Sequence, residues 1–183
     1  MGIFELRQRR LVAANSKFAV YFDDIDDGQG ERVQDYLVVA PLQKTGNLVT
    51  GVAVLAEFEG KVALVRVYRH AVATRGWEIA RGFLDANESE EAAALRELEE
   101  EMSMTCQKTH LRRVGYVTPE PGLMASRVAL YVADGCVRLA GNRVPELGHS
   151  ELRYFARAEI DVLIEKGEVQ DPFTLVAYLR WRT

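Results

Sequence analysis

Residues 82–104 read GFLDANESEEAAALRELEEEMSM, and they are the most informative stretch of the chain. Apolar residues recur there every three or four positions, which predicts an amphipathic helix from about residue 87 to residue 102. The apolar stripe consists of Ala92, Leu95, Leu98 and Met102. We expect Asn87 to cap the helix, with Glu90 three residues later as in a capping box.

Three carboxylates project together from this helix. At 100° per residue, Glu97, Glu100 and Glu101 share a face that points away from the apolar stripe. Like charges at this spacing repel by a few tenths of a kcal/mol per pair, and a hard divalent cation reverses the sign of that interaction. Mg²⁺ prefers oxygen ligands, and it can clamp a diphosphate and activate a water. Glutamate-rich faces are also common as solvated surface, so the carboxylates alone leave both interpretations open.

Length, charge and cysteine content limit the kinds of protein that this chain can be. Its 183 residues suffice for one substantial domain with a buried core. The net charge of -4 gives no basic excess, so we expect no nucleic-acid partner. No apolar run approaches the roughly 20 residues that span a bilayer, so we expect no membrane contact. The two cysteines have no near partner in the sequence, as is usual in cytoplasmic proteins with reduced thiols.

The rest of the chain is rich in predicted strands, with helices near its end. Alternating or β-branched segments predict strands at 18–23, 32–40, 51–58, 61–68, 111–118, 127–133 and 152–155. Residues 24–31 predict a hairpin connection between the first two strands. Two further helices are expected at 158–166, ended by Gly167, and at 172–181, begun by Asp171 and Pro172. The fold class is therefore α/β, in the broad sense that includes α+β.

The spacing in residues 82–104 closely resembles the Nudix box. That motif runs Gly, five residues, Glu, seven residues, Arg-Glu, an aliphatic, any residue, Glu-Glu, any residue, Gly, an aliphatic. The residues in register are Gly82, Glu88, Arg96, Glu97, Leu98, Glu100, Glu101 and Met104. Ser103 stands where the family has a glycine that ends the helix in a left-handed turn. Serine can adopt this turn at a cost of roughly 1 kcal/mol.

This resemblance implies a Nudix-type α/β/α sandwich around a mixed sheet. We expect an N-terminal antiparallel strand region at residues 1–45 and the hydrolase domain at residues 46–183. Residues 68–70 and 77–82 are similar to the approach to the box in ADP-ribose pyrophosphatases and related nucleoside-diphosphate-sugar hydrolases. Pro119 also stands sixteen residues beyond Ser103, as is common in that subgroup. Its members often form homodimers through the N-terminal strands, and we expect a homodimer here.

The resemblance also implies roles for the box residues. Glu97, Glu100 and Glu101 would bind Mg²⁺ or Mn²⁺, with Glu100 and Glu101 at the catalytic centre. The backbone carbonyl of Arg81 would add a ligand. Glu88 and Arg96 would brace the loop and the helix through charge-assisted hydrogen bonds.

Further site residues are expected outside the helix. Arg69, Glu78 and Arg81 are the expected substrate-binding residues. A loop glutamate after the box often orients the water, and Glu151 is the first choice, with Glu146 and Glu120 as alternatives. His149 lies close to Glu151 in the sequence, so contact with substrate stays open for it, but the first expectation is a surface loop histidine. The other two histidines are His70 and His110, and the three are too scattered to predict a histidine metal cluster.

The function implied is metal-dependent hydrolysis of a nucleoside diphosphate linked to a sugar, such as ADP-ribose, to a nucleoside monophosphate and a sugar phosphate. The loop after Gly122 lacks the glutamate that ADP-ribose enzymes often carry, so GDP-mannose and dinucleoside polyphosphates stay open as substrates. A Nudix-fold sensor that binds a nucleotide sugar without cleaving it is the alternative outside the enzymes. Such regulators often lose box carboxylates, and Glu97, Glu100 and Glu101 are all present.

Overall fold

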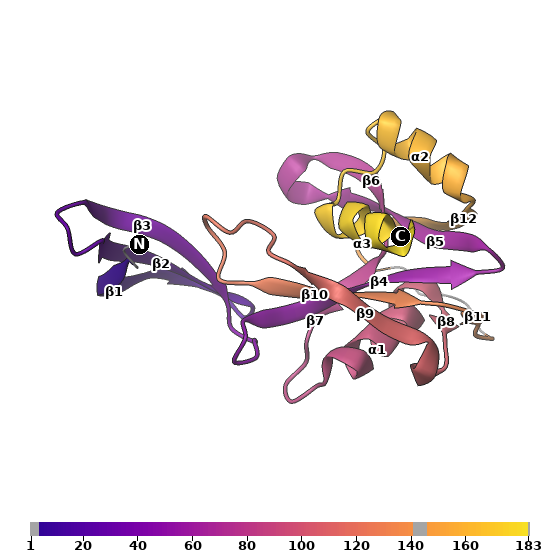
Figure 1. The fold of residues 1–183 in the computed structure, drawn as a ribbon, viewed down its shortest axis with the longest axis horizontal. Helices are drawn as coiled ribbons and strands as arrows, with labels where there is room; N and C mark the ends of the chain where they lie inside the picture. The colour runs from indigo at the N-terminus through magenta and orange to yellow at the C-terminus, as the bar shows by residue number, and fades with distance from the viewer. Residues whose placement is uncertain (1–3, 141–145, 183) are drawn as a thin grey trace. The chain divides into compact units, whose positions relative to one another are not determined.

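The computed structural model describes residues 4–140 and 146–182 (Figure 1). Two compact units are distinguished by their internal contacts. The N-terminal unit comprises Met1–Thr50 and Thr118–Arg127. The sandwich unit comprises Gly51–Val117 and Val128–Thr183. Within the described residues, no helix combines the length and the apolar character needed to cross a membrane.

The N-terminal unit contains a three-stranded antiparallel sheet. Its order is β1 (Glu5–Ala14), β2 (Phe18–Asp26) and β3 (Arg32–Pro41), which confirms the two predicted strands and the hairpin between them. Strand β1 was not predicted, because its sequence ELRQRRLVAA neither alternates nor is rich in aromatic residues. Cross-strand ion pairs support it instead. Arg9 Nε lies 2.8 Å from Asp23, and Arg7 bridges Asp26 through both carboxylate oxygens.

The sandwich unit is built on a seven-stranded sheet. Its main path runs β12-β5-β4-β10-β9, with β6 paired to β5 and β7 paired to β4. The strands are β4 (Val49–Phe58), β5 (Lys61–Arg69), β6 (Thr74–Glu78), β7 (Ala80–Phe83), β9 (Leu111–Val117), β10 (Arg127–Ala133) and β12 (His149–Phe155). The short strands β8 (Met104–Thr105) and β11 (Val137–Arg138) form a separate pair, and η1 (His70–Val72) and η2 (Lys108–His110) are single 3-10 turns.

Strands β4 and β5 pair only where they meet at their hairpin, and beyond it they separate into a fork. Residues 56–58 of β4 pair with 61–63 of β5, after which β5 pairs with β6 and β4 pairs with β7. The short segment from β6 to β7 therefore fills the fork. It was not predicted as strand, because it consists of two pieces interrupted at Ile79. This segment carries Glu78, Arg81 and Gly82 into the middle of the sheet.

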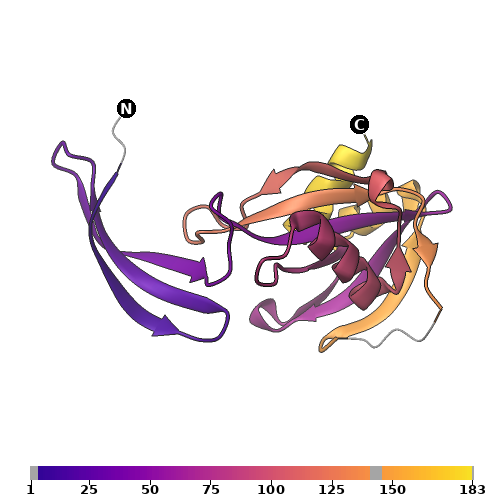
Figure 2. The same cartoon turned by 90° about the horizontal axis from the view of Figure 1, so that it is seen from below.

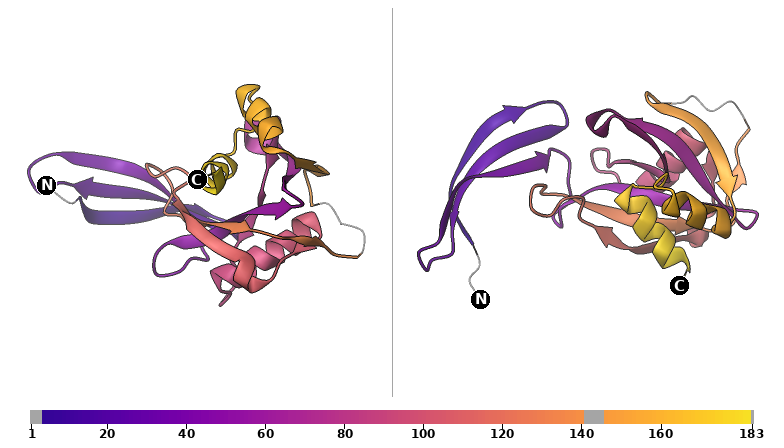
Figure 3. Two further views of the ribbon diagram at one scale, coloured as in Figure 1. Left: turned by 45° about the vertical axis from the view of Figure 1, so that its right-hand side comes forward. Right: turned by 90° about the horizontal axis from the view of Figure 1, so that it is seen from above.

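Helices cover both faces of the sheet of the sandwich unit. Helix α1 (Glu90–Met102) crosses one face (Figure 2), while α2 (Arg157–Glu165) and α3 (Pro172–Arg182) cover the other (Figure 3). The core beneath α2 and α3 joins Leu55, Leu64, Leu130, Ile160 and Phe173, all nearly inaccessible to solvent. The expected α/β/α sandwich is thereby confirmed. The late helices lie within a residue of their predicted bounds.

The ends of α1 partly differ from the sequence-based expectation. Ser89 caps the helix, since its Oγ accepts a hydrogen bond from the Ala92 backbone N–H at 3.2 Å. The prediction that Asn87 is the cap was wrong, because Asn87 has a left-handed backbone (φ 62°) in the turn before the helix. At the other end Ser103 adopts the left-handed conformation expected of the family's glycine, with φ 51° and ψ 45°.

The two cysteines, which the sequence left without a partner, come together after α1. Strand β8 pairs with β11 in the register Thr105 to Val137, and Cys106 and Cys136 occupy the next position of that register. A hydrogen bond from Cys136 lowers the pKa of the Cys106 thiol. Both are free thiols, and Cys136 is buried.

The strained turn at Ser103 generates a stability prediction. Replacing Ser103 with glycine removes the Cβ that makes the left-handed conformation unfavourable, so Ser103→Gly is expected to stabilise the protein by about 1 kcal/mol. Chemical denaturation measures the change. Ser103→Val, which is β-branched, should destabilise, and equal stability of the glycine and valine variants would contradict the turn geometry.

Candidate metal and phosphate site

Two glutamates of α1 are turned into the protein and lie against strand β7. Glu97 and Glu101 are each only 4% exposed, although the sequence placed them opposite the apolar stripe. The Glu101 carboxylate accepts a hydrogen bond from the Arg81 backbone N–H at 2.9 Å. The Glu97 carboxylate lies over Gly82, where a Cβ would come within 2.0 Å of its Oε1. The box glycine is therefore needed so that helix and strand can approach with a carboxylate between them.

The apolar face of α1 is correspondingly rotated from the predicted stripe. Ala93, Ala94, Leu98 and Met102 are buried, whereas Ala92 is exposed and Leu95 half-buried. Periodicity alone could not detect this rotation, because two of the buried positions are charged. Glu100 lies on the outer side of the helix with 49% of its side chain exposed.

Arg96 holds the outer carboxylates of the box in place. Its guanidinium donates to Glu88 at 2.9 Å, to Glu97 at 2.7 Å and to Glu100 at 2.9 Å, and it also reaches the carbonyl of Phe83. Hydrogen bonding to Arg96 lowers the pKa of Glu88. Glu88 and Arg96 thus make the charge-assisted hydrogen bonds that their expected bracing role requires.

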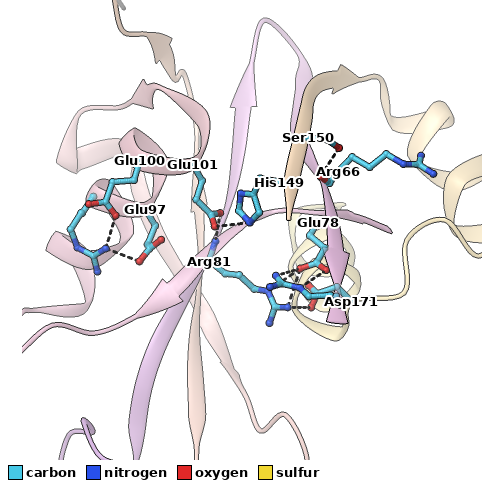
Figure 4. A network of polar contacts seen from close by, with 11 residues as sticks. Arg66, Glu78, Arg81, Glu97, Glu100, Glu101, His149, Ser150 and Asp171 are labelled. Carbon is cyan, nitrogen blue, oxygen red and sulfur yellow. Dashed lines mark hydrogen bonds and ion pairs between the residues drawn. The ribbon is translucent and has the colours of Figure 1, made fainter. Parts of the chain in front are cut away.

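A third side of the site comes from the beginning of β12. Ligand atoms of Glu101, Glu146 and His149 all lie within 4.8 Å of one another. His149 Nε2 is 3.5 Å from Glu101 Oε1, and the two side chains are 3% and 4% exposed. Figure 4 shows the imidazole facing the Glu101 carboxylate. The expectation that His149 is a surface loop residue was wrong, because its side chain points inward from the first position of a strand.

The electrostatics of this cluster favour a cation. The pKa of Glu101 is raised to about 8, chiefly by burial, and the nearby carboxylates of Glu97 and Glu146 contribute to the rise while the hydrogen bond from the Arg81 N–H opposes it. Burial likewise raises the pKa of Glu97 despite its contact with Arg96. Carboxylates crowded in a poorly solvated place bind a proton more tightly, and a divalent cation would take the place of that proton.

A second network of charges lies beside the first, at the start of α3. Glu78 accepts two hydrogen bonds from Arg69, at 3.0 and 2.5 Å, and one from Arg81 at 3.0 Å. Burial alone would raise the pKa of Glu78, but the two arginines hold it below its ordinary value. The Arg81 guanidinium also lies 3.5 Å from Asp171, which caps α3 through Thr174. The sequence identified Asp171 only as a helix cap, and no local pattern predicts its contact with Arg81.

The remaining expected residues are not brought into either network. Glu151 pairs with Arg153 at 2.9 Å and is 42% exposed. Glu120 belongs to the N-terminal unit, where it accepts a backbone hydrogen bond from Gly122. Of the three candidate loop carboxylates, Glu146 is the one placed beside Glu101.

Comparison with known proteins agrees with this geometry. The model of the NUDIX domain matches residues 45–176 of the chain. The chain belongs to the Nudix family. Its carboxylate helix is the Nudix box, and the sandwich around it is the family's fold.

Similarity to particular proteins extends over nearly the whole chain. The ADP-ribose pyrophosphatase of Bacillus subtilis (strain 168) is 30% identical over 162 residues, covering 86% of this chain and 81% of that protein. The CMP-5'-(N-acetyl-N-hydroxy-3-aminopropyl)phosphonate hydrolase of Streptomyces rubellomurinus (strain ATCC 31215) is 26% identical over 175 residues, covering 94% and 79%. A crystal structure described as an ADP compounds hydrolase superposes with a TM-score of 0.80 at 19% identity, covering 98% and 92%. The chain is thus a Nudix pyrophosphohydrolase similar to the ADP-ribose pyrophosphatases.

The residues present fit the divalent cation that Nudix hydrolases generally use. Glu97 and Glu101 offer buried carboxylate oxygens from α1, and Glu146 adds another from the turn before β12. Hard divalent cations prefer such oxygen donors. Carboxylates that converge from two separate parts of the chain are more typical of an ion-binding site than of a solvated helix face.

The close approach at Gly82 generates a prediction about this site. Gly82→Ala places a methyl group where the Glu97 carboxylate lies, so we expect Mg²⁺ and Mn²⁺ affinity to fall at least tenfold and hydrolysis to fall with it. Titration calorimetry and a turnover assay measure the two effects.

Gly46→Ala is the matched control, because a Cβ at Gly46 meets nothing within 4 Å. It should leave both quantities unchanged. If a folded Gly82→Ala protein kept its metal affinity, the position of the Glu97 carboxylate would not depend on its close approach to Gly82.

Proposed function

We propose that this enzyme hydrolyses the diphosphate of a nucleoside diphosphate joined to a sugar or similar group, with ADP-ribose as the first candidate. ADP-ribose would yield AMP and ribose 5-phosphate. The observation that carries the proposal is the buried pair Glu97 and Glu101, with Glu101 next to Glu146 and His149, beside an arginine network. The names of the two relatives support the substrate class, since each joins a nucleotide, ADP or CMP, to a further group.

Glu97, Glu100 and Glu101, with the backbone carbonyl of Arg81, are the proposed ligands of Mg²⁺ or Mn²⁺. When bound, the ion would neutralise diphosphate oxygens and activate a water. Glu101 is held by the Arg81 N–H and Glu97 by Arg96, so both carboxylates are oriented before the ion arrives. Glu100 lies on the outer side of the helix, where its side chain is 49% exposed and pairs with Arg96 at 2.9 Å.

Arg69 and Arg81 are the proposed contacts to substrate phosphate. Both guanidiniums are fixed by the buried Glu78, which limits their motion and aligns their remaining N–H donors. The Glu78 carboxylate is thereby proposed to position the arginines. The side chain of Arg81 also lies 5.0 Å from the centre of the Phe173 ring, which further restricts it.

A loop carboxylate is proposed to act with the helix carboxylates on the water. Glu151, expected first for this role, pairs with Arg153 and is partly exposed. Glu146 lies within ligand distance of Glu101 and His149, which favours it over Glu151.

The deciding experiment is a turnover assay on ADP-ribose, other nucleoside-diphosphate sugars, GDP-mannose and dinucleoside polyphosphates, with Mg²⁺ and with Mn²⁺. We expect metal-dependent release of AMP from ADP-ribose, reduced at least 100-fold in Glu101→Gln. Glu99→Gln is the matched control, because Glu99 lies on the same helix but is exposed. Within the same assay Glu146→Gln should lose far more activity than Glu151→Gln.

Other outcomes of this assay would change the proposal in defined ways. If only GDP-mannose or only a dinucleoside polyphosphate were cleaved, that compound would replace ADP-ribose as the proposed substrate. Loss of activity in Glu151→Gln but not in Glu146→Gln would return the loop role to Glu151. Tight binding without turnover of any compound would support a nucleotide-sugar sensor in place of a hydrolase.

We further propose that the enzyme is a homodimer formed through the N-terminal unit. All ten residues of β1 are exposed, and Leu6 and Leu11 are 53% and 59% exposed. A three-stranded sheet with so little cover does not bury enough apolar surface to be stable alone. A second copy of the same sheet would supply the missing surface.

Light scattering after gel filtration tests the dimer. We expect the wild type to have twice the 20.6 kDa chain mass and the double variant Leu6→Glu/Leu11→Glu to be monomeric. Val162→Glu is the control, because Val162 is 43% exposed on α2 in the sandwich unit. A monomeric wild type would overturn the proposal.

A further inference from the structure

We propose that His149 is a metal ligand through its Nε2 atom, and that this imidazole makes the site prefer a first-row transition-metal ion such as Co²⁺ over Mg²⁺. The inference rests on the metal dependence proposed above and adds the choice of metal to it. It makes His149 a nitrogen ligand, whereas the ligands proposed from the box are all oxygen atoms.

The distances among the three side chains suit a shared ion. Two ligands about 2.1 Å from one ion at an angle of roughly 110° are about 3.5 Å apart. The separation of His149 Nε2 from Glu101 Oε1 is 3.5 Å. It is longer than the 2.7–2.9 Å or so of a charge-assisted hydrogen bond. Because the ligand atoms of the set with Glu146 lie within 4.8 Å of one another, one ion could reach all three if they approached by at most about 1.3 Å.

The backbone holds His149 and Glu146 in place. The His149 N–H donates to the Glu146 carbonyl at 2.9 Å, which closes a tight turn. Gly148 within that turn has φ +93°, and a Cβ there would lie 2.9 Å from the Tyr68 carbonyl of β5. The Tyr68 N–H in turn donates to the Gly148 carbonyl at 2.9 Å. The turn is thus attached to the end of β5, and its two side chains are presented to Glu101 from a fixed base.

The surroundings of the imidazole favour a ligand over a surface role. The His149 side chain is 3% exposed, and the group that its Nε2 faces is a carboxylate already held by the Arg81 N–H. The Glu146 carboxylate adds negative charge within 4.8 Å. A neutral imidazole nitrogen can donate its lone pair to a cation that these carboxylates attract.

The chemistry of the donor set decides the metal. Mg²⁺ binds oxygen ligands almost exclusively, whereas imidazole suits transition-metal ions, and the affinity of a nitrogen-containing site rises from Mn²⁺ towards Co²⁺ and Ni²⁺. A site built only from Glu97, Glu100 and Glu101 would have a weaker preference of this kind, because oxygen ligands also suit Mg²⁺. One nitrogen ligand is enough to make the affinity for Co²⁺ clearly higher than that for Mg²⁺, while both ions can still bind.

The test measures binding of Co²⁺ or Mg²⁺ alone, by titration calorimetry and, for Co²⁺, by visible absorption. We expect the wild type to bind Co²⁺ more tightly than Mg²⁺. His149→Gln should weaken Co²⁺ binding at least tenfold and alter the absorption bands, with Mg²⁺ affinity changed less than threefold. His149→Asp replaces the nitrogen with oxygen, so it should shift the preference towards Mg²⁺.

Controls separate this inference from the function on which it rests. His110→Gln removes an exposed histidine of η2 and should leave both affinities unchanged. Thermal melts of the metal-free variants establish that each is folded. If Co²⁺ affinity and absorption are the same in wild type and both His149 variants, while Glu101→Gln loses them, the inference is wrong and the metal-dependent function stands. If the wild type binds neither ion, the metal dependence itself fails.

Discussion

The site depends on one contact between a helix carboxylate and a strand backbone. Glu101 accepts the Arg81 N–H, and one turn earlier Glu97 lies on Gly82, so α1 is joined to β7 by two acidic side chains where apolar residues would be usual. Burying carboxylates in this way destabilises a protein unless something compensates. The hydrogen bond from the Arg81 N–H offsets part of the cost of burying Glu101, and the ion pair with Arg96 offsets part of the cost of burying Glu97. The negative charge that remains attracts a cation.

The fork between β4 and β5 explains why both charged networks lie in the same part of the sandwich unit. Because β6 and β7 fill the fork, a segment of ten residues presents Glu78 towards β5 and α3 and Arg81 towards both α1 and α3. The Arg81 backbone belongs to the carboxylate site and its side chain to the arginine network. A displacement of this one residue would therefore disturb both the metal ligands and the proposed phosphate contacts, which gives the segment little tolerance for change.

The sequence predicted the elements of this fold well because their signals are local. Helix periodicity and the Asp171 cap needed only neighbouring residues, and the Ser103 turn followed from the spacing of the box. Strand β1 escaped prediction because it is stabilised by ion pairs to β2, which are long-range. The rotation of α1 was missed because a period detects apolar side chains, whereas Glu97 and Glu101 are buried for their charge.

The box residues of the site could be proposed from sequence, and the residues that complete it could not. Glu97 and Glu101 are marked by their spacing, but His149 and Glu146 reach them across a turn whose form depends on Gly148 and on β5. Without that turn, Glu151 was the better choice because it stands next to a predicted strand. Once the turn is known, the bulge in register between His149 and Leu152 explains why Glu151 faces elsewhere. An extra residue in β12 breaks the simple alternation that would have placed His149 and Glu151 on one face, so the same irregularity that turns the imidazole inward leaves Glu151 to pair with Arg153.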